Sequence, residues 1–143
     1  MFAATFAPMR AAGSPASAYA QVGLETAMNS ATPHKLIELL FDGYRDAIAR
    51  ARGALRNGQI EAKARAISHA ARIVEEGLKA GLNLADGGQI AADLNALYAY
   101  IGARLTHANL HNDEAALDEC ARLIEPVHAA WVEIGPRVHA IAQ

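Results

Sequence analysis

The sequence predicts an all-α fold, an antiparallel up-down-up-down four-helix bundle on which a short N-terminal segment docks. Apolar residues recur at spacings of three and four over four successive stretches, which is the helical period. Cap and turn residues separate these stretches at short intervals. Aromatic residues make up only 6% of the 143 residues, and the abundant alanine favours close-packed helices. A chain of this length buries one core, so four amphipathic helices pack together as a single bundle.

The two ends of the chain are expected to lie outside the bundle. Residues 1–17 are rich in Ala, Ser, Pro and Gly and are predicted to form a disordered tail. Residues 18–31 are predicted to form a short helix or capping segment, because Tyr19 and Val22 recur at helical spacing. Such a segment is too short to be stable alone and needs the bundle to dock on. Residues 138–143 are predicted to be a C-terminal tail.

The helix boundaries follow from capping residues. Thr32 is an expected N-cap and is followed by Pro33 at the first helical position. Asn112 is expected to cap the last helix in the same way, and Pro126 inside that helix is expected to bend its axis. The bundle is predicted over 32–137, with helices at about 32–57, 59–84, 88–111 and 113–135.

Each predicted helix has one apolar stripe that is expected to face the core. The stripe of the first helix runs through Leu36, Leu40, Tyr44, Ala47 and Ala51. The second runs through Ile60, Ala64, Ile67, Ala71, Val74 and Leu78, and the third through Ile90, Leu94, Leu97, Ile101, Leu105 and Ala108. The fourth comprises Leu117, Cys120, Ile124, Val127, Trp131 and Ile134.

Charge and cysteine content indicate the compartment and exclude two classes of partner. The formal net charge is −2 and the pI is near 6.3, so neither nucleic acid nor an anionic membrane is an expected partner. The single cysteine, Cys120, fits a reducing compartment. No apolar run reaches the roughly 18–20 residues that cross a bilayer, and the N-terminus lacks a secretory pattern. We therefore expect a cytoplasmic protein without membrane insertion.

Some helix surfaces are more apolar than a bundle needs. Leu39 and Gly43 lie at the edge of the first stripe, where glycine lets another backbone come close. The second helix has an additional seam of small residues about 100° from its core stripe. This seam is either a groove for an amphipathic helix, supplied by the N-terminal segment or by a partner, or an exposed face filled with alanine. The seam comprises Ala66, Ala70, Ile73, Gly77 and Ala80.

The two tyrosines of the third helix also have two interpretations. Tyr98 lies on the flank of the apolar stripe and Tyr100 lies further round the helix. Tyrosine is frequent at protein interfaces because it combines apolar area with a polar tip. A partly buried tyrosine within the bundle explains the pattern equally well.

Three residue patterns are tested for chemistry, and none gives a complete metal site or enzyme site. His107 and His111 are four residues apart near Asp113, but no further metal ligand is fixed. Glu125 and His128 have the spacing of a di-iron motif, which requires a second such motif and two more glutamates. His128 is also expected to sit off the core seam. We expect no metal, cofactor or catalytic residue.

His69 supplies the enzyme-like alternative. An exposed histidine on the second helix of a bundle resembles the phosphoacceptor of histidine phosphotransfer domains, and Arg72 could stand near a phosphoryl group. Ile73 would crowd such a site. A generic helical adaptor is the other alternative.

Several segments together resemble the FliS family of flagellar secretion chaperones. They are "YAQVGLETA", "ATPHKLIELLFDGY", "LNALYAYIGARLTHANLHND" and Trp131, and their order and spacing match from Tyr19 to about Ile134. Two positions depart from the family pattern. Phe41 stands where the family often has tyrosine, and Pro126 interrupts a helix that usually lacks proline.

The resemblance implies a function without chemistry. A FliS-like chaperone binds the C-terminal segment of flagellin in the cytoplasm, prevents premature polymerisation and delivers the subunit to the flagellar export apparatus, a type III secretion system. Tyr19 and Val22 would belong to an N-terminal plug that covers the apolar surface. The implied partner surface comprises Leu39, Phe41, Gly43, Ala66, Ala70, Ile73, Gly77, Tyr98 and Tyr100.

Overall fold

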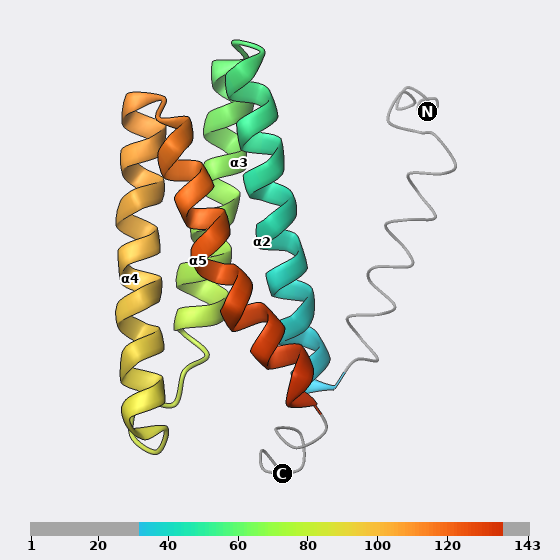
Figure 1. The fold of residues 1–143 in the computed structure, drawn as a ribbon, viewed down its shortest axis with the longest axis vertical. Coiled ribbons are helices and arrows are strands. Elements are labelled where there is room, and N and C mark those ends of the chain that lie inside the picture. The colour runs from blue at the N-terminus through green and yellow to red at the C-terminus, as the bar shows by residue number, and fades with distance from the viewer. Residues whose placement is uncertain (1–31, 136–143) are drawn as a thin grey trace, which may run out of the picture.

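The computed structural model describes residues 32–135, and all regular structure within that range is helical. The predicted tail 1–17, the capping segment 18–31 with Tyr19 and Val22, and the tail 138–143 lie outside the described residues. The all-α fold class is confirmed. The elements are α2 (Pro33–Arg56), α3 (Ile60–Arg72), the π-helix η2 (Ile73–Lys79), α4 (Gly88–His111) and α5 (Glu114–Glu133) (Figure 1).

Contacts between helices show that α5 runs in the opposite direction to both α2 and α4. The Tyr44 hydroxyl donates a hydrogen bond to the Cys120 carbonyl, and the later Arg52 of α2 pairs with the earlier Asp118 of α5. Residue numbers therefore rise along α2 in the direction in which they fall along α5. Between α4 and α5, Arg104 meets Glu119, whereas the later His107 meets the earlier Asp113. In Figure 1, α5 lies beside α4 at its first turns and crosses to the start of α2 at its last.

Side-chain caps fix where the helices begin. The Thr32 hydroxyl accepts a hydrogen bond from the Lys35 amide at 3.1 Å, as an N-cap before Pro33 should. The prediction that Asn112 caps α5 is wrong. Asn112 ends α4 in the left-handed conformation (φ 52°), which asparagine tolerates, and Asp113 caps α5 through the Ala116 amide at 3.2 Å. α5 continues through Pro126 to Glu133.

The second helix is shorter and less regular than predicted. Instead of one α-helix over about 59–84, α-helical geometry ends at Arg72 and helical structure ends at Lys79. The Ala80 amide bonds the Glu75 carbonyl at 3.2 Å, which is the five-residue step of a π-helix. Val74 and Leu78 of η2 are both buried.

One continuous core holds the four helices together. Tyr44 is fully buried at its centre, and its hydroxyl donates a 2.9 Å hydrogen bond to the Cys120 carbonyl of α5. Two positions assigned to the core are exposed instead, namely Ile60 at 49% and Ile90 at 73%. Both lie in the first turn of a helix, and α5 is separated from α4 at the start of α4 (Figure 1).

Lys63 is an unexpected member of the interior, with 2% exposure. Its ammonium donates hydrogen bonds to the Asn109 carbonyl at 2.8 Å and to the Asn112 side-chain oxygen at 2.7 Å. A cation at the C-terminal end of a helix is favoured by the helix dipole. Lys63 therefore ties α3 to the end of α4.

Replacing the central tyrosine tests the α2 to α5 contact. Tyr44→Phe removes the hydrogen bond to Cys120 while keeping the ring, so the free energy of unfolding should fall by about 1 kcal/mol. Tyr98→Phe is the matched control, because Tyr98 is also buried but forms no side-chain hydrogen bond within residues 32–135. Urea denaturation of both variants measures the difference. Equal losses in the two variants would contradict this role of the Tyr44 hydroxyl.

Candidate interaction surface

A groove of about 750 Å³ runs along the outer side of α2 and is bounded by the second helix and by α5. We call it the α2 groove. Half-buried and buried apolar side chains form much of its lining, and charged side chains of α2 and α5 stand at its rim. The lining residues are Leu36, Leu39, Leu40, Asp42, Gly43, Arg45, Asp46, Ile48, Ala49, Arg52, His69, Ile73, Ala121 and Glu125.

Glycines explain how closely α2 approaches the second helix. A Cβ atom on Gly43 would lie 3.4 Å from Cδ1 of Ile73, which is van der Waals contact, so Ile73 packs directly against this position of α2. On the other side, a Cβ atom on Gly77 would lie 2.9 Å from Cδ1 of Leu40. Gly43 therefore admits a neighbouring element of the bundle itself.

The α5 side of the α2 groove is held by ion pairs. Arg45 Nε lies 3.0 Å from Glu125 Oε2, and Arg52 Nη1 lies 2.9 Å from Asp118 Oδ1. All four side chains are partly exposed, so each pair adds little to stability. Their effect is to fix the position of the rim.

His69 stands on the opposite side of the α2 groove. Arg50 Nη2 lies 3.2 Å from His69 Nδ1. Because a guanidinium only donates, Nδ1 is the acceptor and the ring proton sits on Nε2. Ile73, which was expected to crowd a phosphoryl group on His69, lines the same groove.

The structure brings three of the predicted surface residues together. Leu39, Gly43 and Ile73 are half-buried and all line the α2 groove. Helical spacing along α2 and η2 gave the signal for them. Gly77 is also half-buried, but it packs against Leu40.

The small-residue seam of the second helix is not an open groove. Ala66 is 8% exposed and Ala70 is fully buried. The α2 contacts described above lie along the same part of the second helix, at His69, Ile73 and Gly77. The sequence analysis expected Ala66 and Ala70 either to line an open groove or to lie on an exposed face. Both expectations are wrong, because the two side chains are buried. Small side chains let α3 pack closely on α2, since the distance between helix axes depends on the side chains at the contact.

Phe41 and His128 lie elsewhere than predicted. Phe41 is 1% exposed and stacks on the His128 ring, with centroids 5.0 Å apart and planes 12° apart. Phe41 therefore contributes no exposed surface. His128, expected off the core seam, is 8% exposed, and its Nε2 lies 3.6 Å from Asp42 Oδ1.

A second stacked pair closes the bundle at the start of α2. The His34 and Trp131 rings stack with centroids 4.7 Å apart, and Trp131 Nε1 donates to the His34 carbonyl at 3.0 Å. Gly135 lies against the same ring, since a Cβ atom there would be 2.8 Å from His34 Nε2. Trp131 was predicted to lie on the core seam, but no pattern in the sequence indicated that it would stack on His34.

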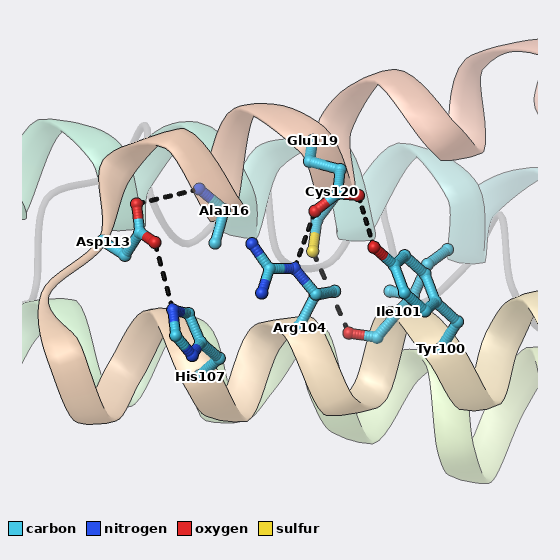
Figure 2. A network of polar contacts seen from close by, with 8 residues as sticks. All are labelled: Tyr100, Ile101, Arg104, His107, Asp113, Ala116, Glu119 and Cys120. Atoms are coloured by element: carbon cyan, nitrogen blue, oxygen red, sulfur yellow. Dashed lines mark hydrogen bonds and ion pairs between the residues drawn. The ribbon is translucent and has the colours of Figure 1, made fainter.

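The two tyrosines of α4 have different environments. Tyr98 is 3% exposed and belongs to the core, and burial raises its pKa to about 12. Tyr100 is 46% exposed, but its hydroxyl donates to Glu119 Oε2 at 2.6 Å. Arg104 Nε donates to Oε1 of the same carboxylate at 2.7 Å (Figure 2). These bonds, from Tyr100 first and Arg104 second, hold the pKa of Glu119 below its usual range.

The histidine pair considered for metal binding takes part in a helix cap. His107 Nε2 lies 3.1 Å from Asp113 Oδ2, and the other Asp113 oxygen accepts the Ala116 amide (Figure 2). The hydrogen bond from the Ala116 backbone N–H lowers the pKa of Asp113, and the contact with His107 lowers it further by a smaller amount. His111 lies beside His107, with ring centroids 4.6 Å apart. Within residues 32–135, no three His, Cys, Asp or Glu side chains are grouped to hold a metal ion.

Cys120 has a packing role. It is fully buried, and its Sγ lies 3.9 Å from the Ile101 carbonyl oxygen. Burial raises the pKa of its thiol to about 12, so the reactive thiolate is scarce near neutral pH.

None of the helices in the described range combines the length and apolar character required to cross a membrane.

The structure is a helical bundle with an apolar groove on its surface, and similarity to known proteins identifies its family. The family profile described as Flagellar protein FliS matches residues 15–138. The chain is 48% identical to the flagellar secretion chaperone FliS of Salmonella typhimurium over 84% of this chain and 89% of that protein. It is 41% identical to FliSB of Pseudomonas aeruginosa, over 79% of this chain and 89% of that protein. The chain belongs to the FliS family of flagellar secretion chaperones, which confirms the resemblance seen in the sequence.

The network around Glu119 predicts a pH dependence of stability. Because its pKa is lower in the folded chain, Glu119 stabilises the fold above its unfolded pKa of about 4.3, and this contribution is lost as the pH falls through the lowered value. Glu119→Gln should therefore lose less stability than the wild type between about pH 6 and pH 3. Glu133→Gln is the control, because Glu133 forms no ion pair with residues 32–135. Chemical denaturation across this pH range would refute the prediction if Glu119→Gln and wild type kept parallel curves.

Proposed function

We propose that the chain is a cytoplasmic export chaperone that binds the C-terminal segment of flagellin. Binding prevents premature polymerisation of flagellin, and the complex delivers the subunit to the flagellar export apparatus. Membership of a family of flagellar secretion chaperones supports this role. The observation that carries the proposal is the α2 groove, an apolar depression bordered by charged side chains.

The shape of the α2 groove suits an amphipathic helix. Leu39 and Ile73 are half-buried and keep part of their apolar surface accessible. An incoming helix that buries them also buries its own apolar face, which is the usual mode of helix-in-groove recognition. A flagellin segment held in this way cannot use the same apolar face to contact another flagellin.

Substitutions in the α2 groove should weaken flagellin binding without unfolding the bundle. Leu39→Asp and Ile73→Asp place a charge where an apolar contact is proposed, so the affinity for the flagellin C-terminal segment should fall about tenfold or more. Ile90→Asp is the matched control, because Ile90 is 73% exposed and does not line the groove. Fluorescence anisotropy titrations give the affinities, and circular dichroism checks that each variant is folded.

These titrations, a pull-down and a phosphorylation assay separate the alternatives. Unchanged affinity for flagellin in folded Leu39→Asp and Ile73→Asp would remove the α2 groove from the proposal. If the wild type binds no flagellin but captures another defined protein, the generic adaptor is favoured. Acid-labile phosphate on His69 would instead support phosphotransfer.

We further propose that residues 18–31, with Tyr19 and Val22, cover the α2 groove before flagellin arrives. The α2 groove begins at Leu36, only a few residues beyond that segment, and an extended chain spans about 3.3 Å per residue. The segment can therefore reach the groove without crossing the bundle.

Truncation of the N-terminus tests this competition. Deleting residues 1–30 should speed association with the flagellin segment, because the groove no longer has to be vacated. Deleting only residues 1–17 is the control, since it keeps Tyr19 and Val22. Stopped-flow fluorescence measures both association rates. Equal rates for the two truncations would argue against a plug.

A further inference from the structure

The charges that line the α2 groove are not balanced. Arg45 and Arg52 are already paired with acidic residues of α5. Asp46 forms no ion pair with any residue of the described range 32–135. Arg50 lies one helical turn after Asp46, but its guanidinium is hydrogen-bonded to Nδ1 of His69 and forms no ion pair with Asp46.

Asp42 is the second acid in the α2 groove that forms no ion pair with a lysine or arginine of residues 32–135. Its side chain is 54% exposed, and its Oδ1 lies 3.6 Å from Nε2 of His128. Asp42 and Asp46 are four residues apart on α2, so their carboxylates are neighbours on one helix face. Like charges at this spacing repel each other, and a cation between them would relieve the repulsion.

The surroundings of these carboxylates suit a long basic side chain. Gly43 lies between them in the sequence and has no side chain to shield them. Leu39 lines the same groove one turn earlier and offers an apolar surface for the methylene stem of a lysine or arginine. Leu39 therefore presents an apolar contact beside two carboxylates. Asp46 forms no ion pair within residues 32–135, and Asp42 has only the His128 ring close to it.

We propose that the α2 groove selects an amphipathic helix that carries a basic residue beside its apolar stripe, through Asp42 and Asp46. This inference rests on the proposed function and specifies the chemistry of the flagellin segment that the groove accepts. It also distinguishes that partner from the chain's own residues 18–31, whose only charged residue is Glu25. A basic partner gains an attraction that the N-terminal segment lacks, which favours its exchange into the groove.

The test measures binding of the flagellin C-terminal segment to the full-length chain. Asp46→Asn should weaken binding about two- to fivefold at low salt, as expected for a partly exposed ion pair. The difference should shrink in about 0.5 M salt, because exposed charges are screened. Asp93→Asn is the matched control, since Asp93 is an exposed aspartate of α4 that bonds Gln89 and does not line the groove.

A second arm locates the basic residue of the partner. Each lysine and arginine of the flagellin segment is replaced by glutamine, and each peptide is titrated with wild type and with Asp46→Asn. For one of these peptides, wild type and Asp46→Asn should bind with equal affinity. The residue replaced in that peptide is then the one that pairs directly with Asp46. Wild-type affinity in Asp46→Asn at low salt, or the same Asp46→Asn effect on every peptide, would overturn charge selection. Absence of binding to the wild type would overturn the proposed function itself.

Discussion

The close contact between α2 and the second helix determines the rest of the architecture. Gly43 accepts Ile73, and Gly77 accepts Leu40, so each helix lacks a side chain where the other places a large one. This interlocking brings the two helices together over the buried Ala66 and Ala70. It also leaves Leu39 and Ile73 half-buried side by side in the α2 groove. The α2 groove therefore depends on how the core packs. A larger residue at Gly43 would change both the packing of the two helices and the groove.

α5 completes the arrangement because it is not parallel to its neighbours. It pairs with α4 through Glu119 near its start and with α2 through Trp131 near its end (Figure 1). Between these contacts, Arg45 and Arg52 of α2 are fixed against α5 and border the groove. The same crossing buries Phe41 beneath His128. One helix thus anchors the bundle at both ends while it defines a wall of the candidate binding surface.

The sequence predicted the elements better than their relative positions. Thr32 and Pro33 gave the start of α2 because a cap acts through local hydrogen bonds. Helical spacing likewise selected Leu39, Gly43 and Ile73, which the fold brings together. Phe41 and His128 were misplaced because spacing gives directions around one helix axis and carries no information on how two axes cross. The burial of Lys63 was missed for a related reason, since its partners at the end of α4 are distant in sequence.

The π-helix η2 gives the two walls of the α2 groove different backbone geometry. Each amide of a π-helical turn bonds the carbonyl five residues earlier, and such turns are rare and frequently lie at functional sites. Ile73 stands at the first residue of η2, whereas the opposite wall is held by ion pairs to a regular α-helix. The α2 groove is therefore formed by a π-helical turn on one side and by an α-helix on the other, so the spacing of side chains differs along its two walls.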